Sequence, residues 1–230
     1  MTRRLLPFVL GGCLWVSGAT TDRKPVLVEL FTSEGCSSCP PADRLLQALD
    51  PSVIVLSEHV DYWDHQGWRD PFSSHANTLR QESYTHRLGG QGPYTPQMVV
   101  DGGVEFVGND PRRATDAIAV AAKRERVAVR LTRSDAGLQI ETGTVSRGAD
   151  VMLAIADDHA ASEVNAGENR GHNLQHVAVL RSLRKVGTVK KGAAFHQSVP
   201  LSTDAAGKRL IVFLQESDLG KVSGAGLLVP

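Results

Sequence analysis

The stretch VLVELFTSEGCSSCPP, residues 26–41, decides how the rest of the chain can be read. Its apolar start, residues 26–31, has the composition of a buried strand and leads into Cys36-Ser-Ser-Cys39. The two prolines that follow fit the first turn of a helix, where a missing backbone N–H costs little. A cysteine at a helix N-terminus lies beside unpaired N–H groups and the positive end of the helix dipole, which favours the thiolate. The spacing therefore predicts a reactive thiol with a second cysteine one helical turn away.

The composition is that of an ordinary globular protein. Of the 230 residues, 41% are hydrophobic and 22% are charged, which suits one large domain or two small ones. The 25 basic and 25 acidic side chains balance, and no long basic run interrupts the sequence. We therefore expect no nucleic-acid partner.

The N-terminus reads as an export signal. Two arginines precede an apolar run at residues 5–10, and a series of small residues ends at Ala19, after which we expect cleavage. The apolar run is too short to span a bilayer, so we expect an exported protein, either periplasmic or secreted. Residues 10–13, Leu-Gly-Gly-Cys, also resemble a bacterial lipoprotein processing site. Cys13 is therefore either removed with the leader or the attachment point of a lipid anchor.

The segment after the cysteines predicts a βαβ unit. Apolar side chains recur at helical spacing over residues 42–49, and the apolar run at 53–56 fits a strand buried on both faces of a parallel sheet. A polar segment at 59–92 then interrupts the pattern and carries Trp63 and Trp68. Its aromatic side chains either pack the insert onto its domain or form a binding surface, and we take both tryptophans as candidate substrate-binding residues.

The second half of the chain changes in pattern. Asp101-Gly102 between two apolar runs predicts a β-hairpin, and Asp110 precedes a helix that ends in a charged run. Short apolar segments separated by Gly, Asp and Ser then predict a mainly antiparallel, sandwich-like β domain. The predicted organisation is a leader at 1–19, an α/β domain at 20–126 with its insert at 59–92, and a β-rich domain at 127–230.

This element order resembles the thioredoxin fold. Glu29 stands where thioredoxins carry a buried acid, one residue farther from the first cysteine than usual. Thr95-Pro96 stands where they carry a cis-proline against the disulfide. The resemblance covers about residues 25–126 and departs from thioredoxin in the residues between the cysteines and in the enlarged insert. The sequences of residues 29–41, 59–64 and 94–102 are most similar to a family of secreted bacterial thioredoxin-like proteins catalogued as a domain of unknown function. This resemblance implies a fold and no activity.

The resemblance implies thiol–disulfide exchange with protein clients. Cys36 would be the exposed nucleophile, and Cys39 the buried thiol that resolves a mixed disulfide and forms the disulfide with Cys36. Glu29 would lie beneath the pair and carry the proton of Cys39, while Pro96 in cis would present the Thr95 backbone to an extended client. The direction of transfer stays open. We expect no cofactor, and the electron partner is not readable from the sequence.

Two other functions stay open. Cys36 and Cys39 with His172 and His176 have the composition of a zinc site, and copper is a further option. These groups lie in different predicted domains, however, and the histidines and the polar run at 168–170 read as surface residues. The fold could also serve as a non-enzymatic binding module. A further polar cluster reads as turn hydrogen bonding: His59, Asp61, Asp64 and His65.

Overall fold

The computed structural model describes residues 25–135 and 137–230, so the expected leader and Cys13 lie outside the described residues. No helix in the described ranges is long and apolar enough to cross a membrane. The elements in chain order are β1 Leu27–Thr32, α1 Pro40–Leu49, β2 Ile54–His59, α2 His75–Leu88, β3 Gln97–Val100, β4 Val104–Val107, α3 Pro111–Ala122, β5 Val129–Ser134, β6 Gly137–Thr142, β7 Ala149–Glu163, β8 Asn173–Val189, β9 His196–Val199, a 3-10 turn Thr203–Ala205, β10 Arg209–Gln215 and β11 Val222–Leu228.

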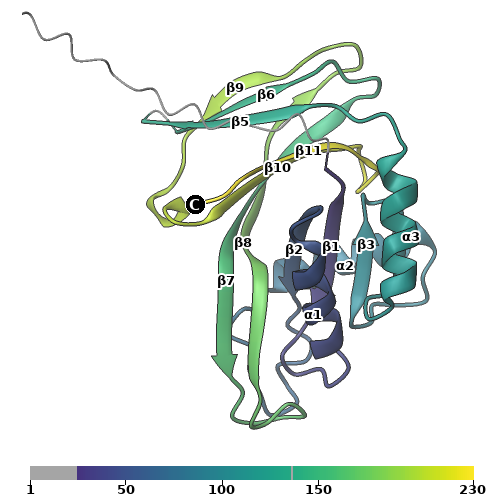
Figure 1. Cartoon of the computed structure of the whole chain (residues 1–230), viewed down its shortest axis with the longest axis vertical. Helices are drawn as coiled ribbons and strands as arrows, with labels where there is room; N and C mark the ends of the chain where they lie inside the picture. Colours follow the sequence, from purple (N-terminus) through teal and green to yellow (C-terminus); the bar gives the residue numbers. More distant parts are fainter. Residues whose placement is uncertain (1–24, 136) are drawn as a thin grey trace, which may run out of the picture.

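One eight-stranded sheet runs through both halves of the chain, in the order β11-β10-β7-β8-β2-β1-β3-β4 (Figure 1). β1 is parallel to β2 and antiparallel to β3. β2 meets β8 in parallel, with Ser57 opposite Val179. The strands after residue 127 therefore extend the sheet that β1 begins. The mixed α/β class is confirmed, whereas the continuity of the sheet was not predicted.

A second, smaller sheet has three antiparallel strands in the order β5-β6-β9. Leu131 of β5 and Ile140 of β6 share a buried cluster with Leu153 of β7 and Val212 of β10. The small sheet thus packs against the part of the large sheet that is farthest from the cysteines along the strand order (Figure 1). Burying each such aliphatic side chain stabilises the fold by about 1.5–3 kcal/mol.

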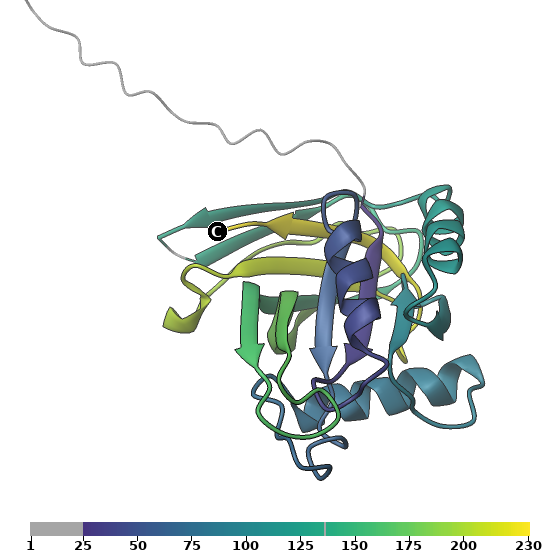
Figure 2. The same cartoon turned by 60° about the horizontal axis from the view of Figure 1, so that its bottom comes forward.

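Helices cover both faces of the β1 side of the large sheet (Figures 1 and 2). Leu46 of α1 and Ala114 of α3 pack with Leu30 of β1 on one face. Tyr84 of α2 packs with Phe31 on the other face, because neighbouring residues of a strand point to opposite sides. Both faces of β1 are therefore buried, which explains its almost continuous apolar sequence.

The predicted hairpin is confirmed, and its turn is held by a hydrogen bond from β1 and by an ion pair with Arg126. Asp101 and Gly102, with φ of 47° and 58°, turn the chain between β3 and β4. The carboxylate of Asp101 is fully buried, accepts a hydrogen bond from the Leu27 N–H at 2.9 Å and pairs with the Arg126 guanidinium. This pair anchors the end of the α3 segment beside the first strand.

Candidate functional site

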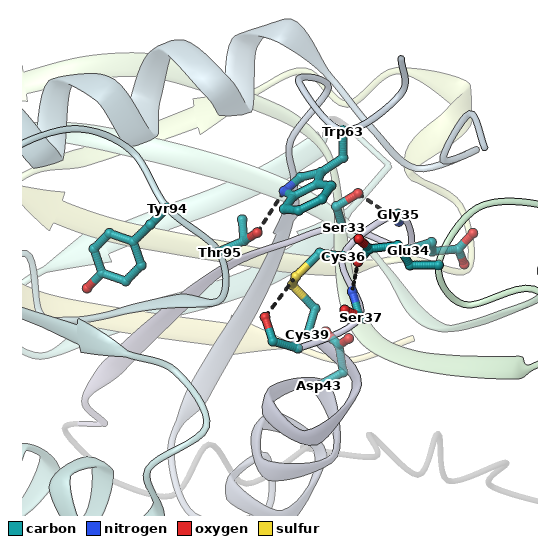
Figure 3. The surroundings of a disulfide bond; sticks show 12 residues. Ser33, Glu34, Gly35, Cys36, Ser37, Cys39, Asp43, Trp63, Tyr94 and Thr95 are labelled. Atoms are coloured by element: carbon teal, nitrogen blue, oxygen red, sulfur yellow. Dashed lines mark hydrogen bonds between the residues drawn. A yellow bond between two sulfur atoms is a disulfide. The ribbon is translucent and has the colours of Figure 1, made fainter. Parts of the chain in front are cut away.

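The Cys36–Cys39 disulfide lies between the end of β1 and the start of α1 (Figure 3). Cys39 is the N-cap residue of α1, and the two prolines after it occupy the first turn, as the sequence predicted. The Sγ atom of Cys36 lies 3.4 Å from the Ser38 hydroxyl oxygen. A thiolate at Cys36 would therefore have a hydroxyl donor and the positive end of a helix nearby.

Both cysteines are fully buried, each with 0% of its surface exposed. The prediction that Cys36 is exposed is therefore wrong. The reason is that segments distant in the sequence cover the loop, including the 59–92 insert and the connection between β7 and β8. A client could reach the sulfur of Cys36 only after part of this cover moves aside.

Trp63 from the insert lies over the disulfide and bonds to Thr95 (Figure 3). Its indole N–H donates to the Thr95 hydroxyl at 2.8 Å. A Cβ atom at Gly35 would lie 3.1 Å from the Cβ of Trp63, so the absence of a side chain at Gly35 lets the insert approach. The Thr95–Pro96 peptide bond is cis, which agrees with the expectation from the sequence. The structure thus brings two of the candidate residues, Trp63 and Thr95, beside the sulfurs.

Trp68 points to a different group, the buried carboxylate of Glu34. Its indole N–H donates to Glu34 Oε2 at 2.9 Å, and the Ser162 hydroxyl also donates to this carboxylate. His176 Nε2 lies 3.1 Å from Glu34 Oε1. The other ring nitrogen of His176 lies 3.8 Å from Asp43 Oδ1. Trp68 therefore contributes to a polar cluster behind the cysteine loop, residues 33–39.

His176 is buried, so its assignment as a surface histidine was wrong, whereas His172 is exposed. Burial alone would lower the pKa of His176, but its contacts with Asp43 and Glu34 outweigh burial and raise that pKa to about 9. The imidazole is therefore protonated at neutral pH. It lies as a cation between two carboxylates that flank the cysteines in sequence.

The connection between β7 and β8 holds the cysteine loop directly, although the sequence of residues 168–170 indicates only a polar surface loop. The Asn169 side chain donates to the carbonyl oxygens of Glu34 at 2.7 Å and Cys36 at 3.0 Å. The exposed carboxylate of Glu168 accepts from the Ser37 N–H at 3.0 Å, and its contacts with the side chain and then the backbone of Ser37 lower the pKa of Glu168. No local sequence signal could have shown these contacts, because they join residues more than a hundred positions apart.

Glu29 is buried as predicted, but its partners differ from those expected. Its carboxylate accepts from Arg80 Nε at 2.9 Å and from the Tyr84 hydroxyl at 2.7 Å, on the α2 face of the sheet. Glu58 lies beside this pair with its carboxylate 3.5 Å from Arg80, and burial raises the pKa of Glu58 well above its usual range. Among the described residues, no hydrogen bond joins Glu29 to either cysteine.

The acidic and histidine residues of the insert hold its turns together. His59 Nδ1 pairs with Asp70 at 2.7 Å, Asp61 accepts from the Thr78 hydroxyl, and Asp64 accepts from the Asp70 N–H. These bonds join positions 11, 17 and 6 residues apart, so His59, Asp61 and Asp64 hold separate segments of the insert together, whereas the sequence had suggested local turn hydrogen bonds. Within residues 25–135 and 137–230, no group of His, Cys, Asp and Glu side chains is arranged to hold a metal ion.

Comparisons with known proteins give a family without an assigned activity. A family model described as "Protein of unknown function (DUF1223)" matches residues 27–215. The crystal structure of protein AGR_C_4864 from Agrobacterium tumefaciens is 31% identical, with a TM-score of 0.78, over 89% of this chain and 93% of that one. The structure of HBP35 of Porphyromonas gingivalis has a TM-score of 0.63 at 13% identity, over 91% and 76% of the chains, and shows a similar fold alone. No curated protein matches the chain.

Proposed function

We propose that this chain, which belongs to the DUF1223 family of proteins of unknown function, is an exported thiol–disulfide exchange protein. The observation that carries the proposal is the Cys36–Cys39 disulfide at the N-terminus of α1, with the Ser38 hydroxyl beside Cys36 and with Thr95 nearby. This position favours the thiolate of Cys36. A disulfide that closes so short a loop contributes little to stability, so chemistry is the better reason for the pair.

The proposal includes a thioredoxin-like unit within residues 25–126. Its support is the strand order β2-β1-β3-β4, with β1 and β2 parallel and β3 and β4 antiparallel. The packing of α1 and α3 on one face adds to this support. Fold alone does not establish an activity, so the chemical argument rests on the cysteine pair.

In the oxidising direction, a client thiolate attacks Cys36 Sγ and breaks the bond to Cys39. This step leaves a client–Cys36 mixed disulfide and a Cys39 thiolate. A second client thiolate then displaces Cys36 and completes the client disulfide. In the reducing direction the same steps run backwards, with Cys36 attacking and Cys39 resolving. A second thiol–disulfide protein restores the starting state in either case.

The burial of the sulfurs makes access the first step of the reaction. One hydrogen bond holds Trp63 to Thr95, and another holds Glu168 to Ser37. The bond between Trp63 and Thr95 contributes about 0.5–1.5 kcal/mol to stability, and the Glu168 carboxylate is exposed to solvent, so a local opening of this part of the cover costs far less than global unfolding. Trp63 and Thr95, which flank the disulfide, would then be the first residues that an extended client meets.

The test is to trap clients on the full chain. Cys39→Ser removes the resolving thiol, so we expect Cys36 to hold clients as mixed disulfides that appear on non-reducing gels of exported material. Cys36→Ser is the matched control and should trap none. Equal, empty lanes for both variants would contradict the proposal. If no client is trapped and the unmodified protein carries stoichiometric zinc or copper that His176→Gln removes, the protein is a metal-binding protein. If neither clients nor metal are found, the remaining function is that of a non-enzymatic binding module.

A further inference from the structure

A buried cluster of three titratable side chains lies behind the cysteine loop. Glu34 precedes Cys36 by two positions, Asp43 follows Cys39 by four, and both carboxylates face His176 of β8. The side chains of Glu34, His176 and Asp43 are 0%, 1% and 6% exposed. The cysteine pair is therefore bracketed in sequence by two carboxylates that one imidazole holds in space.

Asp43 is the member of the cluster that lies on the same helix as the resolving cysteine. Cys39 has helical backbone angles, and its carbonyl accepts the Asp43 N–H at 3.1 Å. Side chains four residues apart on a helix lie on one face, about 5–6 Å apart at Cβ. Figure 3 shows Asp43 on the first turn of α1, beside Cys39.

The Asp43 carboxylate has an oxygen ready to accept a proton. Its Oδ1 atom is buried and has no hydrogen-bond partner among the described residues. Both oxygens of Glu29, in contrast, are occupied by Arg80 and Tyr84 on the other face of the sheet. The nearest donor to Oδ1, the Nδ1 atom of His176, lies 3.8 Å away and beyond hydrogen-bond distance, so this oxygen keeps an unused acceptor position for a proton.

We propose that Asp43, rather than Glu29, accepts the proton of the Cys39 thiol, and that His176, held by Glu34, positions Asp43. This inference rests on the proposed function. When Cys39 resolves the mixed disulfide, its S–H bond breaks and the proton passes to the Asp43 carboxylate. The Cys39 sulfur bonds to Cys36 Sγ, the bond between Cys36 and the client breaks, and the client leaves as a thiolate. Asp43 then gives its proton to that thiolate or to water.

The side chains that face His176 affect how the proton transfer from Cys39 depends on pH. They are Glu34 and Asp43, the His59 ring at 4.6 Å between centroids, and the uncharged Phe72 ring at 5.5 Å. His59 is itself paired with Asp70. Because the two carboxylates lie on either side of the imidazole, replacing His176 by glutamine removes the cation but keeps a side chain able to hydrogen-bond to one of them.

The two steps of exchange can be timed separately with dithiobis-nitrobenzoate and the reduced full chain carrying Cys13→Ser, which leaves Cys36 and Cys39 as its two thiols. The first nitrothiobenzoate is released when Cys36 attacks the reagent, and the second when Cys39 resolves the mixed disulfide. For Asp43→Asn we expect an unchanged first release and a second release about 100-fold slower at pH 7, the lower end of the range for general base catalysis. The deficit should shrink as pH rises, because hydroxide then takes over the removal of the Cys39 proton.

Matched variants separate the alternatives. Asp43→Glu keeps a carboxylate and should restore part of the rate of the second release. His176→Gln should slow the second release at pH 7. Glu29→Gln should leave the pH profile of the second release unchanged. A normal second release in Asp43→Asn, or a defect confined to Glu29→Gln, would overturn the inference. If Asp43→Asn does not fold, His176→Gln decides it by the same readout. A wild-type protein with no first release would overturn the proposed function and this inference together.

Discussion

The protonated state of His176 makes the stability of the fold depend on pH. Its pKa is raised from the ordinary value of 6.5 to about 9, because Asp43 and Glu34 outweigh the effect of burial. A group whose pKa is raised by folding stabilises the native state fully below its unfolded pKa. That contribution is lost as pH rises through the folded pKa. The relevant window therefore runs from pH 6.5 to about 9.

The size of the effect follows from the shift. At about 1.4 kcal/mol for each unit of pKa, the interaction of the imidazolium with its carboxylates contributes about 3 kcal/mol at pH 6. We expect urea unfolding of the oxidised protein to show a free energy about 3 kcal/mol lower at pH 9.5 than at pH 6, apart from changes shared with the control. The variant His176→Gln lacks the imidazolium and should therefore be less stable than wild type at pH 6. Its free energy of unfolding should not show the decrease of about 3 kcal/mol between pH 6 and pH 9.5 that is expected for wild type, at about 1.4 kcal/mol for each unit of pKa.

His172→Gln is the control, because His172 is exposed and belongs to the same β7–β8 region. It should follow the wild-type pH profile. The reasoning would be refuted if wild type and His176→Gln lost stability in parallel between pH 6.5 and 9. It would also be refuted if the wild-type free energy of unfolding rose over that range.

Three further predictions concern contacts that are buried or partly buried. Arg126→Met leaves the carboxylate of Asp101 buried without its cation and should lower the free energy of unfolding by about 3–5 kcal/mol; an unchanged urea midpoint would contradict this. Trp63→Ala removes the bond to Thr95 and should speed reduction by dithiothreitol up to about tenfold; equal rates would show that Trp63 does not limit access. Asn169→Ala leaves the carbonyl oxygen of Glu34 without its side-chain donor, while that of Cys36 still accepts from the Cys39 N–H, and should lower the free energy of unfolding by about 1–3 kcal/mol; an identical urea midpoint would refute it.

Local signals predicted local structure well. The prolines after Cys39 start α1, Asp101-Gly102 forms the turn of the β3–β4 hairpin, and Glu29 is buried. Each of these depends on a backbone preference or on the apolar character of immediate neighbours. They are the features that a single sequence can show without knowledge of distant contacts.

The environment of the cysteines could not be predicted in the same way. Asn169 and His176 reach the loop from β8 and its preceding turn, across 133 and 142 positions of sequence. Both residues reach the loop because β8 pairs with β2. The register of this pairing is Ser57 opposite Val179, and no sequence pattern predicts it. The burial of Cys36 was missed for the same reason. One usable signal was overlooked, namely an acid at Asp43, one helical turn after Cys39.

The reduction potential of the cysteine pair tests the central claim most directly. The full chain would be equilibrated with glutathione and dithiothreitol buffers, its free thiols alkylated, and the oxidised fraction read by mass. Exchange chemistry predicts a two-electron transition between about −270 and −120 mV, the range of exchange proteins of this kind. A pair that stays oxidised in buffers below about −300 mV, as structural disulfides do, would contradict the account.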